Sequence, residues 1–254
     1  PSYVVIANET SAHVKTCIEL RDAGFKGRIL MEKPVAALDQ EASFPGQQDT
    51  FVGFNLRFHP VLRSLKHELH GQRIVSAEFR CASYLPHWRK GRDYRMTSSA
   101  RKELGGGVLS DLSHELDLAN WLLGRWKSLT AFGGNLGVLE VETEEFFGLL
   151  VELEDCPVAT ITLNYIDRCE ERRIIINTEE TTFYADLITG ELCRGDAVIW
   201  HAVDYNLNET YRENHKAIIS GDLQDCCTVA EGEIVQSMMR AAEEASQRRV
   251  WVSR

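Results

Sequence analysis

Residues 29–34 have the sequence Ile-Leu-Met-Glu-Lys-Pro, which places an acid and a lysine directly after a short apolar run. The run over 28–31 predicts a buried strand of a parallel sheet. Ligands of such sheets bind outside the carboxyl ends of the strands. Because proline restricts the residue before it, Lys33 is expected to be held extended at this edge. The alternative is a surface lysine at a strand-to-helix turn.

A second segment, residues 105–124, combines a Gly-Gly-Gly turn with a helical pattern. Three glycines allow the backbone to bend sharply or to approach a ligand closely. An apolar face predicts a helix over 107–123 that ends at Gly124. The residues of that face are Leu112, Leu116, Ala119 and Leu123.

Asp111 and His114 are three positions apart in this predicted helix. They are therefore expected at neighbouring positions of one helix face. A carboxylate beside an imidazole suits proton transfer near neutral pH. The alternative is an acid favoured by the helix dipole, with a core histidine bonded to the backbone.

Five motifs, taken in order, resemble the Gfo/Idh/MocA family of NAD(P)-dependent oxidoreductases, which act on sugars, inositols and nucleotide sugars. They are VVIANETSAH over 4–13, EKP over 32–34, VGFNLRFHP over 52–60, Trp88-Arg89, and the triple-glycine helix. The sequence YLPHWRKGRDYR over 84–95, followed by that helix, resembles a subgroup linked to surface-polysaccharide and sugar-acid biosynthesis.

The resemblance implies reversible hydride transfer between a nicotinamide ring and a hydroxyl carbon of a sugar, sugar acid or nucleotide sugar. Lys33 would polarise the oxygen or shuttle its proton, His114 would be the acid/base, and Asp111 would orient them. The implied cofactor-binding residues are Asn8, His13, Glu32, Trp88 and Arg89, and the implied substrate-binding residues are Arg57, Tyr94 and Arg95. No metal site is expected.

Two departures from the family pattern affect this assignment. The family aspartate usually precedes the histidine by four residues, and counting back four from His114 gives Ser110 rather than Asp111. His114 is therefore the stronger candidate of the pair. Glu9 stands where relatives often have proline, close to the expected cofactor.

The sequence has no Gly-x-Gly-x-x-Gly turn, which normally holds the pyrophosphate of a dinucleotide. By the resemblance, the chain begins at the fourth strand of the nucleotide domain. A fragment of a longer protein and a truncated relative both remain open. The site for NAD or NADP is expected to be incomplete, with weak or absent affinity, and the sequence does not discriminate between the two cofactors.

The expected fold class is α/β followed by α+β. Residues 1–58 are interpreted as a remnant of a dinucleotide-binding, Rossmann-type domain, with strands at 3–7, 28–31 and 50–55 and a helix at 11–23. Residues 59–254 are interpreted as a substrate-binding and oligomerisation domain with an open, mainly antiparallel sheet. Its expected strands are 74–84, 127–139, 144–153, 157–166, 171–177, 180–186 and 196–203, and its other helices are 61–70, 207–220 and 229–246.

Composition excludes several classes of protein. The 254 residues carry a net charge of −10, which argues against a nucleic-acid binder. Seven cysteines without a Cys-x-x-Cys pair favour reduced thiols in a cytoplasmic protein, with no zinc site. No apolar run approaches 18 residues, so no membrane span is expected. A basic cluster near Arg89 and Arg95 is either a solvated loop or an attractor for an anionic substrate.

Two function classes follow: an NAD(P)-dependent sugar or nucleotide-sugar dehydrogenase, and a non-catalytic relative that serves as a binding or oligomerisation module. In either case we predict a homo-oligomer, dimer or tetramer, formed through the open sheet face. We predict that Lys33 and His114 converge on one cleft. We also predict that the edge of the 3–7 strand is open beside partly exposed apolar surface or covered by another chain.

Overall fold

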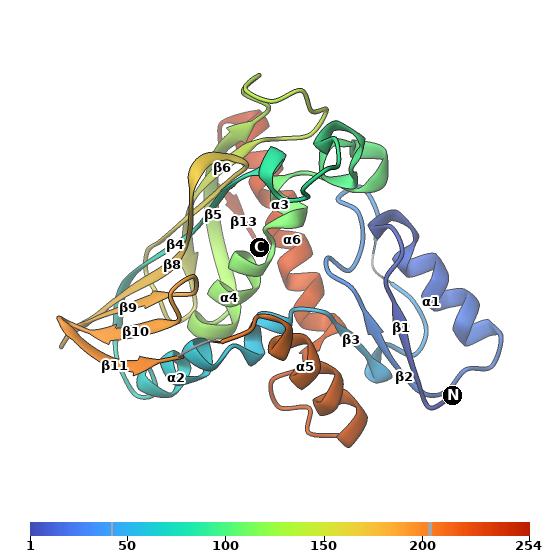
Figure 1. The fold of residues 1–254 in the computed structure, drawn as a ribbon, viewed down its shortest axis with the longest axis horizontal. Coiled ribbons are helices and arrows are strands. Elements are labelled where there is room, and N and C mark those ends of the chain that lie inside the picture. Colours follow the sequence, from blue (N-terminus) through green and yellow to red (C-terminus); the bar gives the residue numbers. More distant parts are fainter. Residues whose placement is uncertain (42, 203–204) are drawn as a thin grey trace.

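The computed structural model describes residues 1–41, 43–202 and 205–254, which form two sheets with helices packed around them (Figure 1). The smaller sheet has the strand order β1-β2-β3-β12, and the larger has the order β11-β10-β9-β8-β4-β7-β6-β5-β13. The expected fold class, α/β followed by α+β, is confirmed.

The small sheet is built mainly by the beginning of the chain. Its elements are β1 (Tyr3–Ile6), α1 (His13–Asp22), β2 (Arg28–Met31), β3 (Thr50–Val52) and β12 (Cys227–Thr228). β1 and β2 pair in parallel, as the strand-helix-strand prediction requires. β12 pairs antiparallel with β3, so two residues near the end of the chain also belong to this sheet. The proposed domain boundary near residue 58 remains a prediction.

β1 has an unpaired edge and is partly exposed. Val5 is 40% exposed, and Tyr3 and Val4 are only half-buried. Within the described residues, β1 pairs along one edge, with β2. This arrangement agrees with the predicted edge beside partly exposed apolar surface, and the alternative, an edge covered by another chain, stays a prediction.

The large sheet is antiparallel apart from the parallel pair β4 and β7. Its strands are β4 (Ile74–Tyr84), β5 (Trp126–Gly134), β6 (Phe146–Leu153), β7 (Ala159–Asn164), β8 (Ile166–Thr178), β9 (Thr182–Asp186), β10 (Glu191–Arg194), β11 (Ala197–His201) and β13 (Val252–Ser253). The sequence patterns predicted most of these strands but missed β10 and β13. Val203, the last residue of the predicted 196–203 strand, lies outside the described residues.

The helices are α2 (Pro60–Glu68), α3 (Val108–Asp111), α4 (His114–Leu123), α5 (Asn208–Ser220) and α6 (Val229–Arg248), in addition to α1. None within the described ranges is long and apolar enough to cross a membrane. The prediction of one continuous helix over 107–123 is wrong, because α3 and α4 are separated at Leu112 and Ser113.

The break has an identifiable cause. In a continuous helix, the carbonyl oxygens of Ser110 and Asp111 would accept from amides four residues later. Instead, Lys33 Nζ donates to both oxygens, and Ser113 Oγ also donates to Ser110 O at 2.9 Å. The Glu115 amide bonds back to Leu112 O. Contacts from a distant segment therefore end α3.

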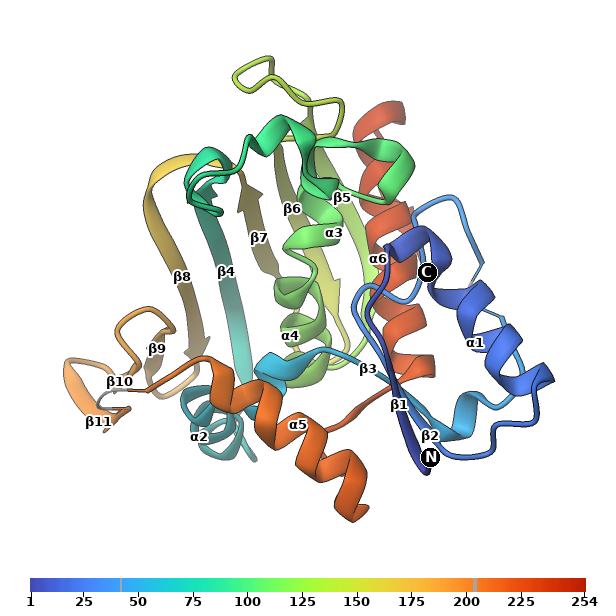
Figure 2. The same ribbon diagram turned by 45° about the vertical axis from the view of Figure 1, so that its right-hand side comes forward.

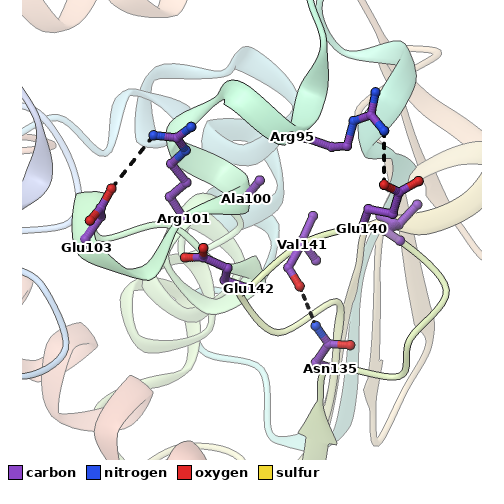
Figure 3. A pocket seen from close by; sticks show the side chains of 9 residues that line it. Arg95, Ala100, Arg101, Glu103, Asn135, Glu140, Val141 and Glu142 are labelled. Carbon is purple, nitrogen blue, oxygen red and sulfur yellow. Dashed lines mark hydrogen bonds and ion pairs between the residues drawn. The ribbon is translucent and has the colours of Figure 1, made fainter.

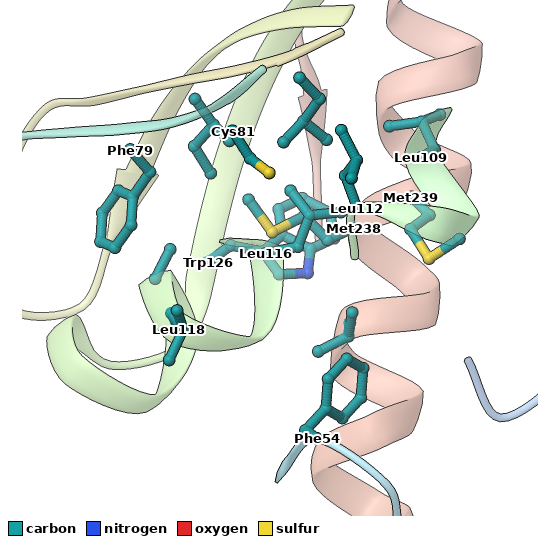
Figure 4. Close-up of a cluster of buried hydrophobic side chains, with 14 of the residues drawn as sticks. Phe54, Phe79, Cys81, Leu109, Leu112, Leu116, Leu118, Trp126, Met238 and Met239 are labelled. Atoms are coloured by element: carbon teal, nitrogen blue, oxygen red, sulfur yellow. The ribbon is translucent and has the colours of Figure 1, made fainter. Parts of the chain in front are cut away.

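The core lies between one face of the large sheet and the pair α4 and α6 (Figure 2). Alternate residues of β7 point into it, and Ala159, Ile161 and Leu163 are fully buried. The cluster in Figure 4 includes Phe79, Leu116, Trp126 and Met238 from β4, α4, β5 and α6. This packing fixes the amino-terminal end of α4, which carries the candidate site.

Candidate active site

Lys33 and the α3–α4 turn meet although they are far apart in sequence. Lys33 Nζ donates to the carbonyl oxygens of Ser110 at 3.3 Å and of Asp111 at 2.6 Å. Such carbonyls at a helix end have no intrahelical donor. Burial lowers the pKa of Lys33, while the Asp111 and Glu32 carboxylates oppose this shift. The amine therefore gives up its proton more readily than a surface lysine.

His114 begins α4, and its side chain is only 8% exposed. Its ring packs edge-on against Phe54, with 5.6 Å between ring centroids. Burial, with the nearby charges of Lys33 and Arg172, lowers the pKa of His114 well below its ordinary value. Nδ1 is buried without a hydrogen-bond partner among the described residues. The lowered pKa favours a neutral imidazole, whose buried Nδ1 makes no hydrogen bond with the described residues.

Asp111 lines a cleft of about 360 Å³ at the carboxyl end of β1. Its Oδ2 accepts a hydrogen bond from the Tyr165 hydroxyl at 2.6 Å. The other residues lining the cleft are Ala7, Asn8, Glu9, Thr10, Ser98, Leu104, Gly105 and Gly106. The cleft therefore joins the segment after β1 to the triple-glycine turn.

The cleft fits one end of a dinucleotide. It lies at the carboxyl end of a parallel strand, where such ligands bind, and its volume is within the usual range for ligand pockets. Asp111 and the polar residues Asn8 and Thr10 line it, whereas Lys33 and His114 are not among its lining residues. The convergence of Lys33 and His114 on one cleft therefore stays a prediction. None of the residues predicted to bind the cofactor belongs to a glycine-rich turn of the kind that holds a pyrophosphate.

The structure places His13 and Glu32 in supporting positions. His13 is buried, and its Nδ1 and Nε2 lie 2.9 Å from Pro34 O and 3.2 Å from Asn8 O. A neutral ring donates to one of these carbonyl oxygens, and the side chain lies between the two loops beside the cleft. Glu32 packs against Gly53, where an added Cβ would lie 3.1 Å from Glu32 Oε2. Burial raises the pKa of Glu32.

The side chains of Trp88 and Arg89 lie in different environments. Trp88 Nε1 donates to Ser83 Oγ at 2.8 Å, and its ring packs edge-on against Tyr165 with centroids 5.3 Å apart. Arg89 is exposed. Trp88 therefore braces the tyrosine that holds Asp111, whereas Arg89 lies at the surface.

Arg57 is enclosed by carboxylates of the protein. Its guanidinium donates to Asp117 through Nε and Nη2, at 2.6 Å for the shortest contact, and to Glu231 through Nη1 at 2.8 Å. Arg57 and Asp117 are both almost fully buried. This geometry favours a structural role over the substrate contact that we predicted.

Arg95 lines another depression, together with Glu140, which the Tyr94 hydroxyl contacts (Figure 3). Arg95 is ion-paired with Asp93 and Glu140, and the Tyr94 hydroxyl accepts from the Glu140 amide at 3.2 Å. This depression shares no lining residue with the Asp111 cleft. A substrate role for these two residues remains a prediction, which the geometry does not favour.

Sequence patterns did not single out Arg172 or Glu115. Arg172, on β8, donates to both carboxylate oxygens of Glu115 at 2.7 and 3.0 Å. Its charge acts on His114 and Lys33, lowering both pKa values. In the sequence it stands in the run Glu-Glu-Arg-Arg over 170–173, which is typical of solvated strand residues. Only the pairing of β8 with β4 places it on the inner face.

The cysteines and metal-binding residue types form no evident centre in the described part of the chain. All seven cysteines are unpaired. Among residues 1–41, 43–202 and 205–254, no three or more His, Cys, Asp or Glu side chains are grouped to hold a metal ion.

Comparison with solved structures defines the class of fold. Levoglucosan dehydrogenase in complex with NADH and levoglucosan superposes with a TM-score of 0.84 at 18% identity, covering 99% of this chain and 79% of that one. The WlbA dehydrogenase from Bordetella pertussis, in complex with NADH and UDP-GlcNAcA, gives 0.75 at 18% identity, covering 100% and 79%. An inositol dehydrogenase homolog from Azotobacter vinelandii, complexed with NAD+, gives 0.78 at 16% identity, covering 100% and 78%. The chain thus has the fold of these dehydrogenases.

Sequence comparison gives the family. Residues 73–184 match the GFO/IDH/MocA C-terminal domain, which confirms the predicted resemblance. The chain is also 26% identical over 141 residues to "Putative oxidoreductase YteT" of Bacillus subtilis (strain 168). That match covers 49% of this chain and 30% of the relative's length.

Proposed function

We propose that this chain contributes the substrate side of an NAD(P)-dependent oxidoreductase that acts on a hydroxyl carbon of a sugar, sugar acid or nucleotide sugar. The observation that carries the proposal is the meeting of Lys33, Asp111 and His114, in which Lys33 Nζ bonds to the last carbonyls of α3. The solved dehydrogenases of the same fold, which hold NADH with levoglucosan or UDP-GlcNAcA, support it.

A bound nicotinamide would supply hydride acceptance, and the protein supplies placement and proton handling. His114, neutral and with Nδ1 unpartnered among the described residues, is the group to take the hydroxyl proton. Lys33, with a lowered pKa, polarises the same oxygen and passes the proton on. Asp111, on the cleft side of Lys33, orients the amine and offsets its charge.

The second candidate function is a binding or oligomerisation module without catalysis. The open edge of β1 and its exposed Val5 favour contact with another chain. A turnover assay separates these candidates, because only the first requires a reactive His114.

The test measures formation of reduced cofactor by absorbance, with millimolar NAD+ or NADP+ and a panel of levoglucosan, free sugars, uronic acids and UDP-sugars. The wild-type chain is expected to reduce the cofactor with at least one substrate. His114→Ala should be slower by about 10²–10⁴-fold, the usual contribution of a general acid/base. His70→Ala changes an exposed histidine and should behave like the wild type. Because weak cofactor affinity is expected, calorimetry first checks that the cofactor binds at the concentration used. Absence of turnover across the panel with bound cofactor would favour the binding module.

A further inference from the structure

Resting on the proposed function, we infer that Tyr165 is a positioning residue that fixes the Asp111 carboxylate beside Lys33. Tyr165 lies between β7 and β8, and its hydroxyl donates to Asp111 Oδ2 at 2.6 Å. This is the short distance expected for an O–H bond to an ionised carboxylate, which is about twice as strong as a neutral bond.

Tyr165 itself is held rigidly. Its amide donates to Glu145 O at 2.9 Å, and its carbonyl accepts from the Leu85 amide at 2.9 Å. The side chain is 0% exposed, and the Trp88 ring packs edge-on against it. The phenol ring is therefore held in one orientation, and its hydroxyl is directed at Asp111 Oδ2.

Asp111 needs such a support because of the helix break. It ends α3, whereas His114 begins α4, so the two side chains do not share a helix that would fix their relative orientation. Lys33 holds Asp111 through its backbone oxygen, and Tyr165 holds it through one carboxylate oxygen. Asp111 also lines the cleft. Tyr165 thus supplies the orientation that the shortened Asp-His spacing no longer provides.

A merely structural tyrosine would also bond its hydroxyl to a nearby acceptor, because buried tyrosines usually do. The two roles differ in what the loss of the hydroxyl changes. A structural bond affects stability alone. A positioning bond lowers kcat for the hydride-transfer step while the KM values for cofactor and sugar stay nearly constant.

The experiment compares Tyr165→Phe with Tyr184→Phe, using the substrate that the wild type turns over. Tyr184 is a matched control, since its hydroxyl also bonds to an aspartate, Asp186, at 3.4 Å on β9. Tyr165→Phe is expected to lower kcat about 10- to 100-fold, the range for one hydrogen bond to a charged group. Its KM values should change less than about twofold. Tyr184→Phe should keep the wild-type kcat.

Asp111→Ala provides a second variant, because it removes the acceptor of the Tyr165 hydroxyl. Its fall in kcat should be at least as large as that of Tyr165→Phe, and in the double variant the losses should not multiply, since both changes break the same contact. Thermal denaturation checks that each variant folds. Wild-type kcat in folded Tyr165→Phe, or losses that multiply in the double variant, would overturn the role of Tyr165 and leave the proposed function standing. Absence of turnover in the wild type would overturn both.

Discussion

Two buried cations in this chain are stabilised in different ways. The Arg57 guanidinium donates to the carboxylates of Asp117 and Glu231, so its charge is balanced by ion pairs. The Lys33 ammonium donates to two backbone carbonyl oxygens, which carry only partial charge. Burial lowers the pKa of Lys33 although the Asp111 and Glu32 carboxylates oppose the shift, and this supports the proposed reactive role of Lys33 rather than a structural one.

Removing Asp117 should be strongly destabilising. Asp117→Ala leaves Arg57 buried with only the partly exposed Glu231 as a counter-ion, and breaking a buried pair costs about 3–5 kcal/mol. Glu19→Ala removes an exposed pair with Lys15 and should cost less than about 1 kcal/mol. Urea denaturation of both variants measures these costs. If Asp117→Ala lies within about 1 kcal/mol of the wild type, the pair is not a major source of stability.

At this scale the sequence predicted Lys33, Asp111 and His114, because charged side chains at the ends of apolar patterns are conspicuous. It did not predict Tyr165, which continues the apolar alternation of β7 and is typical of a core residue. The Tyr165 hydroxyl bonds to Asp111 because the end of α3 packs opposite this strand. Such packing between distant segments leaves no signal in the local sequence.

The break between α3 and α4 shows how a distant contact overrides a local pattern. The apolar face of the predicted helix continues through the break, and all four of its residues are buried as predicted. α3 ends where Lys33, which lies 77 positions before Ser110 in the sequence, donates a hydrogen bond to the Ser110 carbonyl oxygen. Periodicity therefore identified the buried face but not the boundary.

The start of α2 gives a prediction about pH. His59 is buried and caps α2 by accepting the Val61 amide at Nδ1. Burial, with the charge of Arg172, lowers its pKa to about 4. An unfolded histidine has a pKa of about 6.5, so between these values the unfolded chain binds more protons. The contribution of His59 to stability is complete above about pH 6.5 and is lost as pH falls towards 4, by about 3 kcal/mol.

His59→Asn tests this assignment, since asparagine keeps an oxygen that can cap α2 but does not titrate. Urea unfolding at pH 7 and at pH 4.5 should show a smaller loss of stability in the variant than in the wild type. Other buried histidines such as His114 act in the same direction, so the slope is reduced rather than removed. An unchanged loss would mean that His59 does not contribute to acid sensitivity.

At the scale of the molecule, the face of the large sheet away from α4 and α6 remains available. Strand pairing aligns Thr130, Leu150 and Thr160 in one row across it, with Phe132 in the next row. Leu150 is 36% and Phe132 53% exposed. An open face of this kind, partly apolar and backed by a rigid core, suits a subunit interface.

We therefore expect a homo-oligomer whose interface buries at least about 1,200–2,000 Å². Sedimentation at micromolar concentration should give more than one subunit for the wild type. Leu150→Glu with Phe132→Glu should shift it towards the monomer, because charges would be buried at the interface. Ile188→Glu, at an exposed turn between β9 and β10, is the control. A monomeric wild type would contradict this expectation.

Sequence patterns predicted that one sheet is of the parallel type and the other mainly antiparallel, because parallel and antiparallel strands differ in their apolar patterning. They did not predict that the chain returns to the small sheet at β12, where Cys227 pairs with Val52, 175 positions earlier in the sequence. A two-residue strand has too few alternations to be recognised, and its position depends on how α5 and α6 pack.

Transfer of deuterium from a sugar labelled at its hydroxyl-bearing carbon to the nicotinamide cofactor is the most direct test of a hydride-transfer site at Lys33 and His114. Mass spectrometry should detect labelled reduced cofactor with the wild-type chain at millimolar cofactor. Lys33→Met should lower the rate of label transfer by about 10²–10⁴-fold, whereas Lys26→Met, at an exposed position, should not. Label transfer by Lys33→Met at the wild-type rate, or reduced cofactor without label, would contradict the assignment.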